Sequence, residues 1–434
     1  STSSLIIALS PWHVNLSRTA TENTLVVFFI SLGSLFFFYW IKKNNFTILI
    51  LSFISFGITL LIYQAPRAFL PLFIPLLIIS FLKWKMNKKK IIHVIFLYSI
   101  VILTPLLVIL SSSDLSLRIR ILSIFNHPET QLTIDENLRE DGISDTPIFI
   151  SRMFHNKVID YSSLFLENYF KHYSFDFLFT DKGFPDRYRV PSNGLLNLIE
   201  LPFILLGVWF LLRNYRRIGL FLVGWVLIAP IGSSLTFDDV PNLQRSMLVF
   251  PSISIISAYG FINSYLFLKR YKYSLIFTTV IVLTFIYSIL FYLHQYYVHQ
   301  LVHRPWYRQE GYVELIQKVN NLLPDYKKTV ITNRESAPTI FFLFYSKYDP
   351  LKFQKEKEGK FLGESDSVSF YKYEFSDEEC PLRIDDKTKN LTGEDGILYI
   401  NSSHCNKDIP KTNLIDTIKR NDGSEVFRIL EVKR

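Results

Sequence analysis

Apolar stretches of about 20 residues recur in two parts of the chain, residues 1–110 and 196–298, with short polar turns between them. A helix needs roughly 20 mostly apolar residues to cross a hydrocarbon layer of about 30 Å. Eight stretches meet this requirement, at residues 23–41, 46–64, 67–82, 91–110, 196–213, 217–236, 245–267 and 273–298. The sequence therefore predicts an all-α polytopic membrane bundle, with transmembrane helices in 1–110 and again in 196–298.

Composition supports this interpretation over two or three soluble domains. Hydrophobic residues are 49% of the chain and aromatic residues are 16%, with 39 Phe among 434 residues. Charged residues are only 20%, and the region 299–434 has the charge density of a soluble domain. We expect residues 1–10, which are also apolar, to be the end of an earlier span, so that the chain is a fragment that begins part-way through a longer protein.

The basic residues fall in every second turn between the apolar stretches. These turns contain Lys42 and Lys43; Lys83, Lys85, Lys88, Lys89 and Lys90; Arg213, Arg216 and Arg217; and Lys269, Arg270 and Lys272. Basic turns tend to stay in the cytoplasm. The connections 10–22, 63–67, 111–194 and 236–245 and the tail from residue 299 are therefore predicted to be outside. One span added or missed would break the alternation.

The formal net charge of +9 comes largely from these turns. Basic clusters placed in this way indicate membrane topology rather than phosphate binding to nucleic acid. We therefore expect membrane lipids among the partners and no nucleic acid. A composition rich in Ile, Lys, Asn and Phe is typical of an AT-rich bacterial genome, so we expect a multi-pass protein of the plasma membrane.

The outside connection 111–195 contains one helical pattern. Apolar side chains recur at steps of three and four between Ile150 and Tyr169, which is one face of a helix. The opposite face is polar and carries His155, Asn156, Lys157 and Asp160. We expect an amphipathic helix that lies in the membrane interface. A helix packed within the connection itself is the alternative.

The tail 299–434 alternates helical and extended patterns, which predicts a small extracytoplasmic α/β domain. Helices are expected at 312–323 and 337–345, and strands at 329–332, 367–373, 396–400 and 425–432. The two cysteines of the chain, Cys380 and Cys405, lie in this tail. A disulfide in an oxidising compartment and two free thiols both fit the sequence.

Three outside turns carry an arginine next to an apolar helix, namely Arg18, Arg67 and Arg245. One such arginine could simply reach lipid headgroups. Three on one face predict a cationic pocket at the membrane surface, because a guanidinium binds phosphate through paired hydrogen bonds. The same turns supply further candidates for this pocket, which are His13, Tyr63 and Gln64.

Asp238 and Asp239 are weak candidates for a catalytic acid or base. A solvated Asp-Asp-Val-Pro turn is the alternative. Paired carboxylates could also bind a divalent metal, but no spacing of His or Cys supports a metal site, and none is predicted. The sequence has no glycine-rich phosphate loop, so we expect no nucleotide and no other cofactor.

At these turns the sequence resembles the GT-C class glycosyltransferases that use polyprenyl-phosphate sugars, in the branch of the protein mannosyltransferases and the lipid A aminoarabinose transferase. The residues that carry the resemblance are Ser10-Pro11-Trp12-His13 through Ser17-Arg18, Tyr63-Gln64-Ala65-Pro66-Arg67, Val190-Pro191-Ser192-Asn193-Gly194, Arg245 with Pro251 and Gly260, and the segment 341–350 that ends in Tyr-Asp-Pro.

The resemblance implies a GT-C-like bundle that transfers a sugar from a polyprenyl-phosphate carrier to an acceptor hydroxyl on the extracytoplasmic face. It implies that Arg67 and Arg245, with Arg18 and His13 nearby, bind the lipid phosphate. The catalytic Asp of the family lies in the first outside loop, before the region that this chain matches. We therefore expect the present chain alone to be inactive and leave its catalytic base unassigned, together with the sugar and the acceptor.

Two other functions fit the sequence. A transporter or flippase for lipid-linked sugars would have repeat symmetry and helices broken at mid-membrane, and the sequence shows no repeat. A membrane-anchored sensor or scaffold would act through the C-terminal domain, and would not need the outer arginines.

Overall fold

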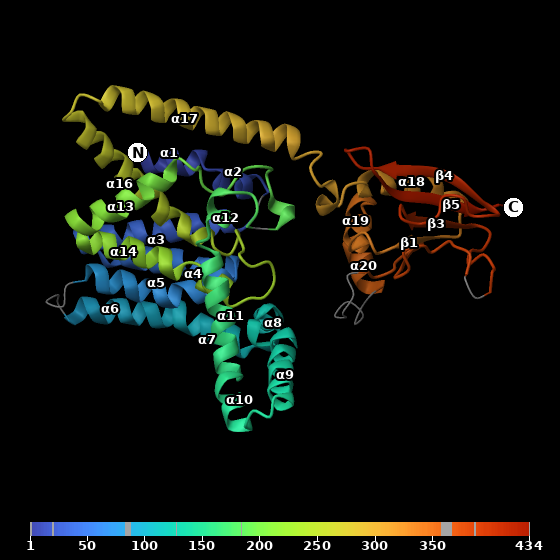
Figure 1. The fold of residues 1–434 in the computed structure, drawn as a ribbon, viewed down its shortest axis with the longest axis horizontal. Helices are drawn as coiled ribbons and strands as arrows, with labels where there is room; N and C mark the ends of the chain where they lie inside the picture. Colours follow the sequence, from blue (N-terminus) through green and yellow to red (C-terminus); the bar gives the residue numbers. More distant parts are fainter. Residues whose placement is uncertain are drawn as a thin grey trace. The chain divides into compact units, whose positions relative to one another are not determined.

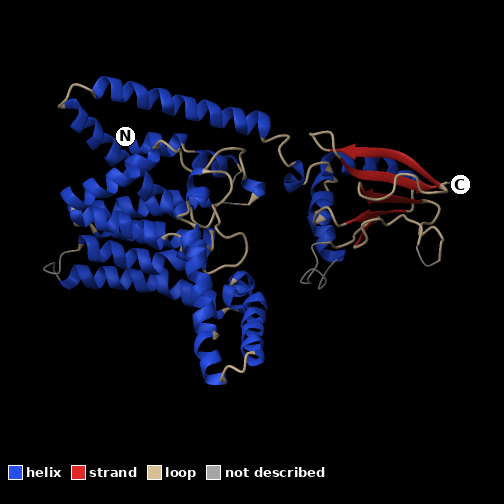
Figure 2. Cartoon of the chain, viewed as in Figure 1, coloured by secondary structure: helices blue, strands red, loops and turns tan. Residues whose placement is uncertain are grey.

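The computed structural model describes residues 2–19, 21–82, 88–126, 128–183, 185–356, 367–385 and 388–433. Lys83 and Lys85 of the second basic turn lie outside the described residues. Contacts divide the chain into a helical unit, Ser1–Tyr296, and a unit that contains a sheet, Tyr297–Arg434, close to the boundary expected at 299 (Figures 1 and 2).

The first unit is built from helices of very different length. They are α1 (Thr2–Leu9), α2 (Pro11–Arg18), α3 (Asn23–Lys43), α4 (Phe46–Ile62), α5 (Ala65–Phe81), α6 (Lys88–Tyr98), α7 (Thr104–Ser111), α8 (Ser113–Leu122), α9 (Pro128–Ile143), α10 (Ile148–Phe154), α11 (Lys157–Lys171), α12 (Phe175–Phe179), α13 (Glu200–Asn214), α14 (Arg216–Ile228), α15 (Ile231–Ser234), α16 (Phe250–Lys269) and α17 (Ser274–His294).

Five helical segments of the described chain are long and apolar enough to cross a membrane. They are Asn23–Lys43, Lys89–Ser111, Arg216–Ser234, Met247–Lys269 and Ser274–His299. The second of these joins α6 to α7 through a π-helical turn, Ser99–Leu103, just before Pro105. A proline lacks the N–H that an α-helix needs, so a wider turn at this point keeps the helix continuous.

The other predicted spans are shorter helices. The stretches 46–64 and 67–82 form α4 and α5, each with 17 residues, and the stretch 196–213 forms α13 with 15 residues. A rise of 1.5 Å per residue gives α4 and α5 a length of about 26 Å and α13 about 23 Å. The helical unit therefore has fewer full-length spanning helices than the eight that the apolar stretches predict.

Close packing of α13 on α16 depends on two glycines. A methyl group added to Gly260 of α16 would overlap the carbonyl oxygen of Phe203 in α13, and one added to Gly207 of α13 would overlap the carbonyl oxygen of Ile256. The two backbones therefore touch where each helix has a glycine. Small residues at such crossings are typical of membrane helices, whose association depends on packing.

The connection 111–195 is more helical than predicted and forms α8 to α12. The expected amphipathic helix is interrupted, because Asn156 ends α10 and accepts hydrogen bonds from the N–H groups of Val158 and Ile159 to begin α11. In Figure 1, α11 crosses the ends of the long helices. Part of the expected apolar face packs against α14 of the helical unit, where the Tyr169 hydroxyl of α11 donates to Leu227 O at 2.8 Å.

The second unit contains a five-stranded mixed sheet with the order β2-β1-β3-β5-β4 (red in Figure 2). Its strands are β1 (Lys328–Thr332), β2 (Tyr373–Ser376), β3 (Ile397–Ser402), β4 (Thr412–Lys419) and β5 (Glu425–Val432), and its helices are α18 (Tyr312–Leu322), α19 (Pro338–Tyr345) and α20 (Pro350–Glu356). Strand β1 is parallel to β2 and β3, whereas β5 is antiparallel to β3 and β4. Apolar residues of α18 and α19 form its core with the sheet.

One strand prediction in this unit is wrong, and one strand of the structure is missing from the prediction. The pattern at 367–373 predicts a strand, but Phe370 and Tyr373 close a tight turn with Tyr371 at φ 51°, and β2 begins only at Tyr373. Strand β4 has no counterpart in the prediction. Its alternation is broken by a register shift between Leu414 and Asp416, and an irregular strand lacks the period of two by which strands are recognised.

Cys380 and Cys405 form a disulfide in this unit, which resolves the choice between a bridge and two free thiols. Replacing both cysteines by alanine is expected to lower the unfolding free energy of the unit by about 3 kcal/mol, because the bridge closes a loop of about 25 residues. Proteolysis of the full chain in increasing urea measures this change. Reductant should destabilise the wild type by the same amount and leave the double variant unaffected; an equal effect on both proteins would contradict the assignment.

The substitution Gly260→Ala tests the contact between α13 and α16. The added methyl group must push the two backbones apart, so we expect a loss of about 3 kcal/mol of stability, measured as thermal unfolding in detergent. Gly142→Ala in α9 is the control, since among the described residues no atom outside the local backbone of its own helix lies within 4 Å of the added methyl group. If both variants have the same melting temperature as the wild type, the described packing of α13 on α16 is wrong.

Candidate functional site

Two of the arginines predicted to bind phosphate line one cavity of about 310 Å³ in the helical unit. Arg67 comes from the first turn of α5, and Arg245 comes from the connection between α15 and α16. Gln64, also predicted, lies in the lining, as do the polar residues Ser123 and Thr236. The remaining wall is formed by apolar or small side chains of α5, α7 and α8 and of segments 122–125 and 232–235.

Arg245 is buried, with 5% of its surface exposed, and it is bound mainly by its own connection. Its Nη1 donates to Thr236 Oγ1 at 2.7 Å and to Asp238 O at 2.6 Å. Its Nη2 lies 3.4 Å from a carboxylate oxygen of Asp238. The Nε atom has no hydrogen-bond partner in the described part of the chain. The guanidinium is therefore fixed in position and keeps one buried donor free.

Arg67 is half-buried and less constrained. Its Nε donates to Leu60 O at 3.3 Å, and among the described residues its terminal nitrogens have no partner. It lies in the first turn of α5, where Gln64 makes no side-chain cap. Pro66 has no N–H and the N–H of Arg67 donates to Gln64 O at 3.0 Å, so it is the helix dipole rather than free N–H groups that favours an anion at this N-terminus. Among the described residues, the cavity thus combines two guanidinium groups with a helix start and with the carboxylate of Asp238.

His172, at the end of α11, holds the connection that carries Arg245. Its Nδ1 lies 2.8 Å from Asn168 O, and its Nε2 lies 2.8 Å from Ser233 Oγ and accepts the N–H of Asn242 at 3.4 Å. Asn242 in turn accepts the N–H of Arg245 at 2.9 Å. Burial lowers the pKa of His172 to about 4, the bond to Asn168 opposes this shift, and the charge of Arg245 adds to it. The imidazole is therefore neutral.

The predicted residues His13 and Arg18 do not line this cavity. His13 stacks on Phe250 with ring centroids 6.2 Å apart, and burial lowers the pKa of His13. Arg18 is exposed and lies over the ring of Tyr296 at 5.4 Å. Tyr63 ends α4, is half-buried against the core and is also absent from the lining.

The Ser-Pro-Trp-His segment that contains His13 makes hydrogen bonds to the backbone of two other connections. Trp12 is fully buried, and its Nε1 donates to Leu243 O at 2.9 Å, two residues before Arg245. The N–H of Trp12 and the hydroxyl of Ser10 both donate to Leu195 O. The segment therefore contacts the connection that carries Arg245 through a hydrogen bond to its backbone, and the predicted role of His13 and Arg18 in binding phosphate stays a prediction.

The two aspartates have different roles. Asp238 pairs with Arg245, whereas Asp239 pairs with Arg187 and lines a separate surface hollow. Asp239 thus does not reach the arginine cavity. Among the described residues no group of three or more His, Cys, Asp and Glu side chains is placed to hold a metal ion.

No protein-family model, no curated protein and no solved structure matches this chain in comparisons of its sequence and fold. The function is therefore inferred from the geometry of the helical unit.

Neutral, buried His172 makes stability depend on pH. The pKa of histidine is near 6.5 in the unfolded chain and about 4 in the fold. Only the unfolded chain binds the proton between these values, so the stability from this residue is complete above pH 6.5 and falls by about 3 kcal/mol as the pH drops to 4.

The variant His172→Gln, which stays neutral, should show a shallower decline in melting temperature between pH 7.5 and 4.5. Other titrating groups contribute equally to both proteins, so the difference between the two slopes isolates His172. Parallel slopes would show that the pKa of His172 is the same in the folded and unfolded chain.

Proposed function

We propose that the cavity of Arg67 and Arg245 binds the phosphate of a membrane lipid and that the protein is a glycosyltransferase that uses a lipid-phosphate sugar donor. The observation that carries the proposal is that these two arginines, far apart in sequence, line one cavity. Guanidinium groups bind phosphate oxygens through short, charge-assisted hydrogen bonds.

The remaining lining suits a lipid. Leu106 and Leu110 of α7 and Ile119 and Leu122 of α8 give the cavity apolar walls next to the cationic groups. A phosphate that carries a hydrocarbon chain satisfies both parts of the lining, whereas a water-soluble anion would leave the apolar part unused. A polyprenyl-phosphate sugar belongs to this chemical class.

The arginines would act in the reaction on the leaving group. When the bond between the sugar and the phosphate breaks, negative charge grows on the phosphate, and donors already fixed in a partly buried site stabilise that charge. Arg245 is fixed by Thr236 and Asp238, so it needs little rearrangement. The acceptor hydroxyl must lose a proton to a base, and neither Asp238, which pairs with Arg245, nor Asp239 is assigned that role.

The topology belongs to the same proposal. We infer eight crossings, with α4, α5 and α13 spanning a bilayer that thins around them or crossing only its hydrocarbon part. The basic turns then lie in the cytoplasm, and the arginine cavity and the C-terminal unit lie outside. The exposed apolar side chains at the tip of the α9–α10 hairpin, Ile143, Ile148 and Phe149, would enter the outer interface.

The substitution Arg67→Ala tests the phosphate site. It removes a guanidinium whose terminal nitrogens have no other described partner, so binding of radiolabelled polyprenyl phosphate in nanodiscs should weaken about 10- to 100-fold with little change in melting temperature. Arg67→Lys should recover only part of the loss, because lysine cannot bind two oxygens in parallel. Arg216→Ala, an exposed arginine of a basic turn, is the control.

Enzymatic activity is tested with polyprenyl-phosphate sugars in vesicles, using the gene that supplies any preceding region. Loss of both polyprenyl phosphate release and sugar transfer in Arg67→Ala would support the glycosyltransferase. Passage of the label across the bilayer on its lipid would favour a flippase. Binding that is unchanged in Arg67→Ala, or equally strong for a polyprenol without phosphate, would refute the phosphate site and direct attention to the C-terminal unit.

A further inference from the structure

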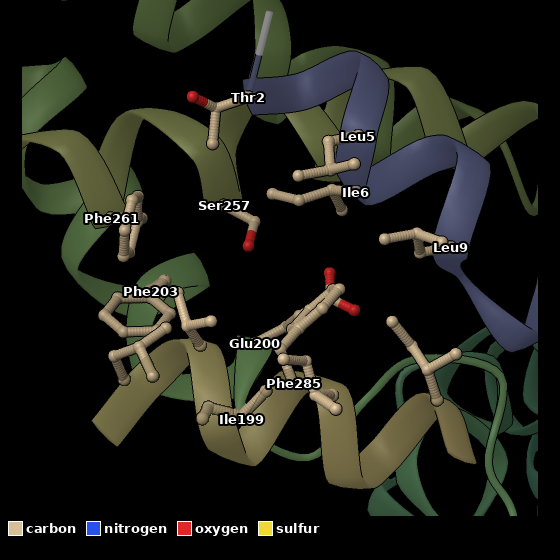
Figure 3. A pocket seen from close by; sticks show the side chains of 14 residues that line it. Thr2, Leu5, Ile6, Leu9, Ile199, Glu200, Phe203, Ser257, Phe261 and Phe285 are labelled. Carbon is tan, nitrogen blue, oxygen red and sulfur yellow. The ribbon is translucent and has the colours of Figure 1, made fainter. Parts of the chain in front are cut away.

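A second cavity, of about 250 Å³, lies between α1, α13, α16 and α17 (Figure 3). Its walls are side chains such as Leu5, Ile6, Phe203, Phe261 and Phe285. No residue of the arginine cavity takes part in its lining. It is therefore a separate site with apolar walls.

Two polar groups point into this apolar space. Figure 3 shows the carboxyl group of Glu200 and the hydroxyl of Ser257 directed toward its centre, and the two residues are only 2% and 1% exposed. Glu200 Oε1 accepts two hydrogen bonds from Asn197, one from its backbone N–H at 3.2 Å and one from its side-chain Nδ2 at 3.0 Å. Glu200 Oε2 and Ser257 Oγ have no partner among the described residues.

A buried polar atom without a partner costs about 1–3 kcal/mol, and a buried charge costs more. The described part of the lining contains no Lys, Arg or His that could neutralise Glu200. The two bonds from Asn197 and the start of α13 offset only part of the cost of burying a charged carboxylate, and the other oxygen faces the cavity. An ionisable side chain retained in such surroundings marks a functional site.

We propose that this cavity binds a single-chain amphiphile whose head is a primary ammonium group. The ammonium donates to Glu200 Oε2 and to Ser257 Oγ and supplies the missing positive charge, while the chain packs among Phe203, Phe261 and Phe285. A hydroxyl head would satisfy the hydrogen bonds but leave the carboxylate without a counter-charge. An anionic head would be repelled. The site does not depend on the function proposed for the arginine cavity.

The test measures binding of radiolabelled decylamine to the full chain in phosphatidylcholine nanodiscs, with decanol and decanoate as matched probes. We expect decylamine to bind at least about tenfold more tightly than decanol, since a buried charge pair is lost with the alcohol. Glu200→Gln keeps the shape and the bonds to Asn197 and should abolish the preference for the amine. Glu22→Gln, an exposed carboxylate, should leave it unchanged.

A second measurement uses only the wild-type protein and so does not depend on the folding of a variant. A hydrophobic carbodiimide should label Glu200, as identified by peptide mass, and decylamine should protect it while decanol should not. Adding lysophosphatidylethanolamine, a single-chain lipid with the same ammonium group, then separates two sources of the ammonium: competition identifies a lipid head, and no competition identifies a free amine. Equal binding of decylamine and decanol, or protection by decanol alone, would overturn the proposal.

Discussion

The buried guanidinium of Arg245 requires hydrogen-bond partners, because a cation removed from water is costly unless it is paired. Those partners come from its own connection, at Thr236 and Asp238, so the connection can have only the conformation that provides them. His172 fixes the same connection from α11, and Trp12 fixes it from α2. Three elements distant in sequence are thereby held around one charge, and the cavity exists because they meet there.

The helical unit thus presents two cavities of opposite character. One has Arg67 and Arg245 next to apolar walls, and the other has the carboxyl group of Glu200 without a cation among its described lining residues. In a medium of low dielectric constant such charges act strongly and at short range. If both proposals hold, a ligand whose head suits one cavity is repelled by the other, and the two sites would select different amphiphiles by charge rather than by shape.

The sequence predicts the parts of this structure that depend on local pattern. Apolar length predicts the five long helices, and the alternation of basic turns places Arg67 and Arg245 on one face, where the structure brings both into one cavity. The roles of Trp12 and His172 could not be predicted, because both act on backbone atoms far along the chain and such contacts leave no periodic signal. Glu200 did carry a signal in the sequence, because it is a lone carboxylate near the start of the apolar stretch 196–213.

In the proposed topology the disulfide and the arginine cavity constrain each other. After the turn that carries Arg67, the chain passes through α5, α6–α7, α13, α14, α16 and α17 before it reaches the C-terminal unit. The number of these segments is even. If each of them crosses the membrane, the C-terminal unit lies on the same side of the membrane as the turn that carries Arg67. Disulfides persist in oxidising compartments. The Cys380–Cys405 bridge therefore favours the outer side for Arg67 as well, independently of the basic turns. The disulfide and the basic turns place Arg67 on the same side only if the short helix α13 crosses the membrane.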